Sequence, residues 1–211
     1  MKKVVIIGAG GFGREVAWII ERINKVSPTW DLVGFLDDDS SLLNKPVYKD
    51  YNVIGGIDYS NSLDEVYFVC AVGNAKIRKA IVDKVGNKNF ATIIDPSAII
   101  SDTSKIGGGS IICQNVIVSI NVDIGKHCDL IYGSIVGHDS KIDSFVTLYP
   151  SVNISGNVNV GACVEIGTGA KVIQQKNIGN NVIIGAGSVV IKDIPNDCTA
   201  VGVPTKLIKM Y

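Results

Sequence analysis

The chain has 211 residues, and its 20 Lys and Arg balance its 20 Asp and Glu, so its formal net charge is zero. This balance does not favour nucleic acid or an anionic membrane surface as the main partner. The five cysteines are scattered without a CxxC pair, which is typical of buried thiols in a reducing cytosol. No apolar stretch is long enough to span a membrane or to form a signal peptide, so we expect a cytoplasmic protein. The two histidines of the chain are eleven residues apart with no third ligand nearby, so no metal site is expected.

The first part of the chain predicts alternating strands and helices. A buried strand is expected over residues 4–7, and a helix with apolar periodicity over 14–24. Further strands are expected over 32–36 and 66–72, and the second of these leads into a helix over 75–85. This order indicates a parallel sheet, and residues 1–92 are interpreted as a Rossmann-like α/β domain.

A glycine-rich turn, Gly8 to Gly13, joins the first strand to the first helix and has the GxGxxG form. It would direct backbone N–H groups and a helix N-terminus at phosphates, and Asp37 stands near the distance at which a carboxylate meets a ribose. The alternatives are a tight turn that binds nothing and a nicotinamide-dependent oxidoreductase. The domain is too short for a six-stranded dinucleotide fold, so a mononucleotide or nucleotide-sugar site fits better.

A strict period of six dominates the second part of the chain. Every sixth residue from Ile94 to Val190 is aliphatic, and a helix with 3.6 residues per turn cannot keep this period on one side. Three hexads would make one coil of a narrow prism, with the aliphatic side chain pointing to its axis. The series is Ile94, Ile100, Ile106, Ile112, Val118, Ile124, Leu130, Val136, Ile142, Leu148, Ile154, Val160, Ile166, Val172, Ile178, Ile184 and Val190.

Two further positions of the hexad support this interpretation. The residue after the aliphatic is often Gly, for which we expect a turn-forming role, and the residue four after it is small or β-branched, with Lys176 as the exception. Residues 93–211 are therefore predicted to form an all-β parallel β-helix with a C-terminal tail. The spacing alone leaves its handedness open. Outward aliphatic residues form a predicted subunit interface, namely Ile111, Ile117, Ile135, Ile183 and Val189.

The chain has two histidines. His138 stands at a predicted corner, followed by Asp139, and its neighbours one coil away are Ile120 and Gly156. An outward imidazole beside a carboxylate suits general-base chemistry, although a solvated surface histidine is the alternative. His127 is expected to be a surface corner residue.

The succession of a glycine-rich Rossmann-like domain and hexapeptide repeats resembles a bacterial acyltransferase family. This family includes sialic acid O-acetyltransferases and the N-acetyltransferases of UDP- and GDP-linked amino sugars. The matching residues are Gly8-Ala9-Gly10-Gly11-Phe12-Gly13-Arg14-Glu15, Phe35-Leu36-Asp37-Asp38, Gly73-Asn74, His138-Asp139 and Val201-Gly202-Val203-Pro204.

The resemblance implies a left-handed β-helix and an acetyl-CoA-dependent acetyltransferase acting on a surface-glycan sugar precursor. His138 would be the general base, and Asp139 would raise its basicity. The nucleotide sugar would be held by Gly10, Gly11, Phe12, Asp37, Asp38 and Gly73. Acetyl-CoA would lie in the groove between neighbouring subunits of a homotrimer, near Thr147, Thr168 and Ala186.

Three positions depart from the family pattern. Thr147 stands where a second histidine is usual, Ile131 replaces an asparagine, and Asp139 replaces a longer Glu. The acceptor therefore stays open between the amine of a nucleotide-linked amino sugar and a hydroxyl of sialic acid or another sugar. A non-catalytic β-helix trimer and a short acyl donor other than acetyl-CoA are further alternatives.

Overall fold

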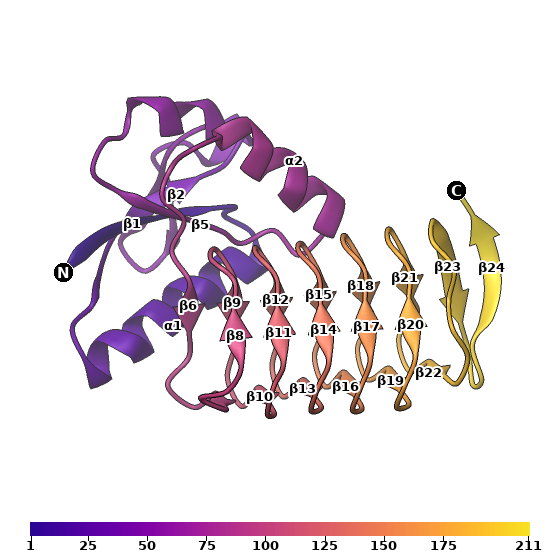
Figure 1. Ribbon diagram of the computed structural model, residues 1–211. Helices are drawn as coiled ribbons and strands as arrows, with labels where there is room; N and C mark the ends of the chain where they lie inside the picture. Colours follow the sequence, from indigo (N-terminus) through magenta and orange to yellow (C-terminus); the bar gives the residue numbers. More distant parts are fainter.

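The computed structural model describes all 211 residues as an α/β unit at one end of a long three-sided prism (Figure 1). The α/β unit is built on a five-stranded sheet in the order β3-β4-β2-β1-β5, which is parallel except for the β3–β4 pair. Its elements are β1 (Lys2–Ile7), α1 (Gly11–Val26), β2 (Trp30–Leu36), β3 (Pro46–Tyr48), β4 (Tyr51–Gly55), β5 (Tyr67–Cys70) and α2 (Ala75–Val85). Short 3₁₀ turns cover Ser40–Leu42 and Ile57–Ser62.

The two sides of β1 face different cores, as the two-residue period of a strand requires. Val4 and Ile6 share the large core that contains α1 and continues into the prism. Val5 and Ile7 belong to the smaller core formed with α2. The sheet is therefore covered on both sides, and its α1 side joins the prism.

The prism has three faces of short parallel strands, and strands eighteen residues apart pair along each face. The first face comprises β6 (Ile93–Ile94), β9 (Ile111–Ile112), β12 (Asp129–Leu130), β15 (Thr147–Leu148), β18 (Glu165–Ile166) and β21 (Ile183–Ile184). The second face comprises β7 (Ile99–Ile100), β10 (Ile117–Val118), β13 (Ile135–Val136), β16 (Asn153–Ile154), β19 (Lys171–Val172) and β22 (Val189–Val190). The third face comprises β8 (Lys105–Ile106), β11 (Asp123–Ile124), β14 (Lys141–Ile142), β17 (Asn159–Val160) and β20 (Asn177–Ile178).

A final hairpin extends the first face at the C-terminal end of the prism. Strand β23 (Cys198–Val201) pairs in parallel with β21, and β24 (Lys206–Met210) pairs antiparallel with β23. This hairpin covers the last coil, so that its strand edge on the first face does not stay open. No helix of the chain has the length and apolar character needed to cross a membrane.

The aliphatic repeat forms the core of the prism, as the period of six predicts. Its members from Ile112 to Val190 are all buried. The prediction is wrong at the first coil, where Ile94 is 37% exposed and Ile100 and Ile106 are only partly buried. No coil precedes this one, so its residues lack the neighbour that covers every later member of the series.

The glycines that follow the aliphatic residues do not form the turns, which corrects the predicted role. Their backbone φ is not positive, whereas a left-handed residue recurs at every sixth position from Gly109 to Gly187. At Gly137 an added Cβ would lie 2.7 Å from the Gly156 backbone nitrogen of the next coil. These glycines are therefore needed because successive coils approach too closely for a side chain.

The residues of the predicted subunit interface lie in different environments, and the outward position predicted for Ile111 is wrong. Ile111 is fully buried in the core that α1 shares with the prism, and Ile183 lies on the first face. Ile117 and Ile135 are each 36% exposed and lie in register on the second face, with Ile99 beside them at 64%. The second face therefore carries the contiguous apolar stripe.

Candidate functional site

The glycine turn leaves an open cradle at the N-terminus of α1. Helix α1 begins at Gly11 without a side-chain cap, and a Cβ at Gly10 or Gly11 would have no atom within 4 Å. A Cβ at Gly13 would instead lie 1.9 Å from the Gly8 carbonyl oxygen, so Gly13 permits close packing of helix and strand. The free N–H groups and the helix dipole make this cradle suitable for a phosphate group.

Two carboxylates at the end of β2 hold the loops around this cradle. Asp37 Oδ2 accepts the Ala9 N–H at 2.8 Å, and Asp38 Oδ1 accepts the Ile57 N–H at 2.7 Å. Asp37 is partly buried and Asp38 is exposed. An ionised carboxylate can accept further hydrogen bonds, so both residues can position the loops and still meet a ribose hydroxyl.

Gly73 lies at the same edge of the sheet, because β5 is adjacent to β1. The loop that contains Gly73 is seated on the first face of the prism, where the Thr147 hydroxyl donates to the Gly73 carbonyl at 2.7 Å. Glu165 accepts the Ala75 N–H at 3.2 Å at the start of α2. The side chain of Thr147 is fully buried in this contact. In this chain the loop before α2 thus covers the Thr147 side chain, which the resemblance places near acetyl-CoA.

Arg78 joins the two parts of the molecule, and sequence reasoning did not identify it. Its fully buried guanidinium contacts Asp129 Oδ2 at 2.6 Å and donates to the carbonyl oxygens of Gly73 and His127. Asp129 Oδ1 has no hydrogen-bond partner. Burial raises the pKa of Asp129 to about 7, although Arg78 acts in the opposite direction. The pair therefore anchors α2 to the first face.

His127 is a packing residue rather than the surface residue predicted. It is 8% exposed, and its ring stacks on Phe145 with centroids 5.1 Å apart and meets Phe90 edge-on at 4.8 Å. Burial lowers the pKa of His127 to about 4, so the ring is neutral at physiological pH. The sequence could not predict this burial, because it results from the approach of α2 and its flanking loop, which cover this corner.

His138 lies at the corner between the second and third faces, after β13. Its Nδ1 is 2.8 Å from Asp139 Oδ2, and the two side chains are 54% and 45% exposed. Hydrogen bonds from His138 and then from Asn121 hold the pKa of Asp139 below its usual value. An ionised carboxylate can only accept, so Nδ1 carries the proton and Nε2 is left as the basic nitrogen.

The next coil leaves room for the imidazole. A Cβ at Gly156 would lie 2.5 Å from both Cε1 and Nε2 of His138, so only glycine lets the ring rest over this position. The Gly156 N–H has no acceptor within the chain. Ile120 occupies the equivalent corner position one coil earlier and is 53% exposed. A basic nitrogen and an unused N–H donor therefore lie side by side.

Thr168 and Ala186 lie one above the other on a different corner, between the first and second faces. Both are exposed, and the Gly187 N–H donates to the Thr168 carbonyl at 2.8 Å. The second face separates this corner from His138. A ligand that touches all three residues must therefore lie across the apolar stripe or between two chains.

A single chain does not bring all the candidate residues together. Gly10, Asp37 and Gly73 share one edge of the α/β unit, which contacts the first face through Thr147 and Glu165. His138 lies on the corner opposite the first face of the triangular prism. The sugar-binding candidates and the basic imidazole are thus held on opposite sides of the same chain.

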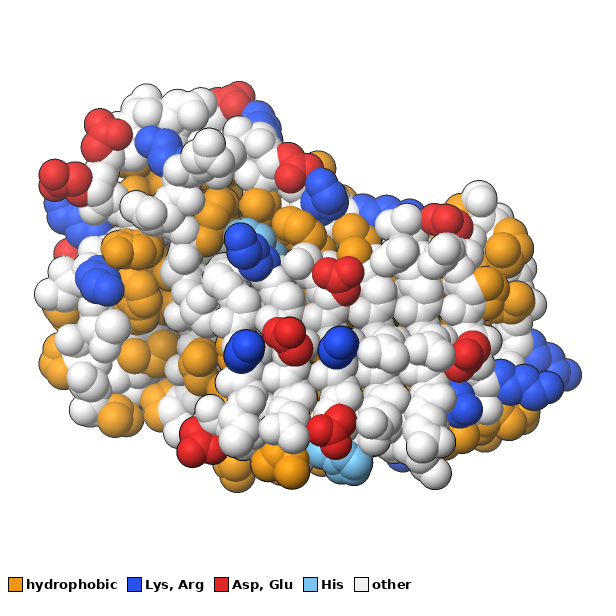
Figure 2. Space-filling view, in the orientation of Figure 1, with side chains coloured by type: hydrophobic (Ala, Val, Ile, Leu, Met, Phe, Trp, Pro, Cys, Tyr) orange, Lys and Arg blue, Asp and Glu red, His pale blue; other side chains and the backbone are white.

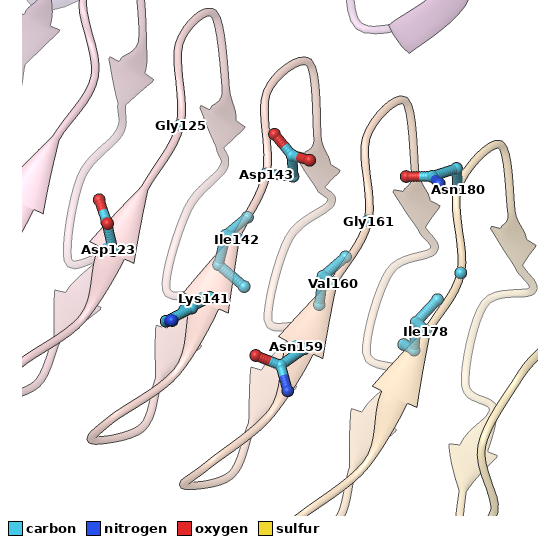
Figure 3. Close-up of a pocket in the computed structure, with 11 residues that line it drawn as sticks. Asp123, Gly125, Lys141, Ile142, Asp143, Asn159, Val160, Gly161, Ile178 and Asn180 are labelled. Carbon is cyan, nitrogen blue, oxygen red and sulfur yellow. The ribbon is translucent and has the colours of Figure 1, made fainter.

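The third face is polar, and part of it is joined by side-chain hydrogen bonds. In Figure 2 this face is mostly white, the colour of the backbone and of side chains that are neither charged nor hydrophobic, with a few alternating charges. A shallow hollow follows this face along Asp123, Lys141 and Asn159 (Figure 3). Asn159 Nδ2 donates to Asn177 at 2.9 Å, and Asn177 donates to Asp193 at 3.1 Å. No group in this hollow is a nucleophile paired with a base, so the His138 corner is the better catalytic candidate.

The prism of hexads, the glycine cradle and the imidazole–carboxylate pair define a hexapeptide-repeat acyltransferase. Residues 3–85 match the PglD N-terminal domain family. The chain is 32% identical over 186 residues to the GDP-perosamine N-acetyltransferase of Escherichia coli O157:H7. This match covers 86% of this chain and 82% of that protein. It therefore belongs to the family of sugar acetyltransferases with a PglD-type amino-terminal domain, and it is an acetyltransferase.

Solved structures agree over nearly the whole chain. The acetyltransferase domain of PglB from Neisseria gonorrhoeae FA1090, in complex with acetyl coenzyme A, is 32% identical with a TM-score of 0.88 and covers 98% of this chain and 99% of that one. PerB from Caulobacter crescentus, in complex with CoA and GDP-perosamine, is 28% identical with a TM-score of 0.89 and covers 98% and 97%. The prism is thus the left-handed parallel β-helix that the resemblance implied.

Proposed function

We propose that this protein transfers the acetyl group of acetyl-CoA to the amine of a nucleotide-linked amino sugar, with His138 as general base. The observation that carries this proposal is the exposed His138–Asp139 pair, whose Nε2 is free beside an unused Gly156 N–H. The relatives support the reaction class, since one is a GDP-perosamine N-acetyltransferase and another is solved with CoA and GDP-perosamine.

In the proposed reaction the amine nitrogen attacks the thioester carbon, and His138 Nε2 takes the proton that the nitrogen loses. The carbon–sulfur bond then breaks, and CoA leaves as its thiol after receiving that proton. The Nδ1–H bond to Asp139 holds the tautomer and stabilises the imidazolium. The Gly156 N–H is the proposed donor to the tetrahedral oxyanion. No covalent acyl-enzyme is needed, because no nucleophile with its own base lies at this corner.

The proposal requires two chains for each site. The glycine cradle and His138 lie on opposite sides of one chain, and the apolar stripe of Ile99, Ile117 and Ile135 on the second face suits a subunit contact. A threefold assembly would bring the His138 corner of one subunit to the α/β unit of its neighbour. Thr168 and Ala186 would then line the acetyl-CoA groove at this contact.

Subunit mixing tests this arrangement. Gly10→Leu is expected to cover the cradle without disturbing the fold, because a Cβ there meets no atom. Gly10→Leu and His138→Ala should each be inactive alone. Random trimers refolded from equal amounts should recover about a quarter of the wild-type sites, since each site then draws one intact half from each variant. Absence of recovery in mixed trimers verified by mass spectrometry would place both halves in one chain.

The acceptor is tested by measuring free thiol release from acetyl-CoA. We expect turnover with GDP-perosamine or a UDP-linked 4-amino sugar, and none with the corresponding 4-hydroxy sugar nucleotide. Turnover only with free or CMP-activated sialic acid would move the reaction to O-acetylation. If no acceptor gives thiol release in protein that still binds CoA, the result would favour a binding trimer without catalysis.

A further inference from the structure

A hydrogen-bond chain runs along the His138 corner from one coil to the next. Asn121 lies one coil before Asp139, and its Nδ2 donates to Asp139 Oδ1 at 3.1 Å. The other carboxylate oxygen, Oδ2, is 2.8 Å from His138 Nδ1. Each oxygen of the carboxylate therefore has a different partner, and its plane is defined from two sides.

The backbone holds Asn121 and Asp139 in the conformation that this series of hydrogen bonds needs. Asn121 and Asp139 have φ values of 55° and 58°, in the left-handed region where Asn and Asp are enriched. The Asn121 N–H donates to Thr103 Oγ1 at 3.0 Å, and the Asp139 N–H donates to the Ile120 carbonyl at 3.1 Å. The two side chains thus leave equivalent points of successive corners and run in register.

Resting on the proposed role of His138, we propose that Asn121 is a positioning residue that acts through Asp139. Its amide donates to Oδ1 and so directs Oδ2 at the imidazole. The carboxylate then keeps the proton on Nδ1 and leaves Nε2 basic. The short Asp side chain at this position makes the second anchor more important, because Asp139 is 45% exposed and water would otherwise compete for its oxygens.

Other corner asparagines show that the left-handed turn does not itself require this contact. Asn115 has a φ of 57° and also donates its backbone N–H to a hydroxyl of the preceding coil, that of Ser97. Its side chain makes no hydrogen bond to a neighbouring side chain. Asn115 therefore provides a matched control for the turn without the carboxylate contact.

Few charged residues lie near His138. Asp139 is the one charged group that bonds to His138, and Gly156 lies against the ring. Asp102 lies at the same corner two coils earlier, and Asp123 and Lys141 are the first outward residues on the third face. Effects of Asn121 on the pH dependence are therefore expected to pass through Asp139.

The test uses Asn121→Gly, which deletes the side-chain amide and introduces a residue that adopts positive φ without steric strain. We expect a fall in kcat of about tenfold with the KM for acetyl-CoA unchanged, and an altered acidic limb of the pH profile. Asn121→Asp should lose at least as much, because a second carboxylate would face Asp139 Oδ1. Asn115→Gly should retain wild-type kinetics.

A second readout does not depend on turnover. With two histidines, of which His127 is buried and neutral, histidine-labelled protein gives an assignable imidazole NMR spectrum. We expect Asn121→Gly to lower the Nδ1–H fraction of His138, and Asn115→Gly to leave it unchanged. Unchanged tautomer populations in Asn121→Gly, or equal changes in Asn115→Gly, would overturn the positioning role. If His138→Ala stays active while the tautomer still responds to Asn121, the proposed function fails and the hydrogen-bond chain stands.

Discussion

His138→Ala is expected to lower kcat by about 10²- to 10⁴-fold, the range that a positioned general base supplies. The side chain is 54% exposed and contacts a glycine on one side, so its removal leaves no cavity in the core. The melting temperature and the Kd for CoA should therefore stay close to those of the wild type. Steady-state thiol release with the amino-sugar acceptor measures kcat, and circular dichroism measures the melting curve.

The second histidine supplies the matched control. His127→Phe keeps an aromatic ring between Phe90 and Phe145, and it removes an Nδ1 atom that has no partner. A neighbouring corner residue, Phe145, already adopts a left-handed conformation with φ of 61°. We expect near wild-type kcat for His127→Phe. A loss below tenfold for His138→Ala would count against the general-base role.

Arg78→Met is expected to destabilise the fold by about 3–5 kcal/mol, because it leaves Asp129 buried without its charged partner. The side chains of both residues are 0% exposed, so water cannot replace the lost contact. Urea unfolding measures the free energy. The double variant Arg78→Met/Asp129→Leu should recover most of the loss, since it removes the unpaired charge as well.

The effect of this pair on the free energy of unfolding depends on pH. Burial raises the pKa of Asp129 to about 7 from an ordinary value of 3.8, so the folded state binds the extra proton between these values. Stability therefore falls as pH rises through this window. In Arg78→Met the opposing effect of the guanidinium is gone and the pKa of Asp129 rises further, so the deficit should shrink as pH is lowered from above 8 to about 7 and stay constant below, where Asp129 is protonated in both folded proteins. A pH-independent deficit, or a double variant as unstable as the single one, would contradict the role of the pair.

The six-residue period and the local chemistry of the sequence determined much of the fold of this protein. The aliphatic series required a prism with one inward residue per hexad, and Gly8 to Gly13 required a tight strand-to-helix turn. The neighbours of His138 along the corner, Ile120 and Gly156, also follow from a repeat of eighteen residues. The same arithmetic brings Asn121 beside Asp139, so this signal was present in the sequence.

The tertiary structure decided what depends on the approach of two surfaces. Thr147 and His127 occupy outward or corner positions of the repeat, and only the docking of α2 and its loops buries them. Arg78 and Asp129 are 51 residues apart with no shared period, so their pairing follows from that docking alone. The glycines after the aliphatic residues serve coil-to-coil contact rather than the turn. A repeat determines spacing within the prism because backbone pairing enforces it, whereas packing between domains depends on shape and buried charge that no local pattern records.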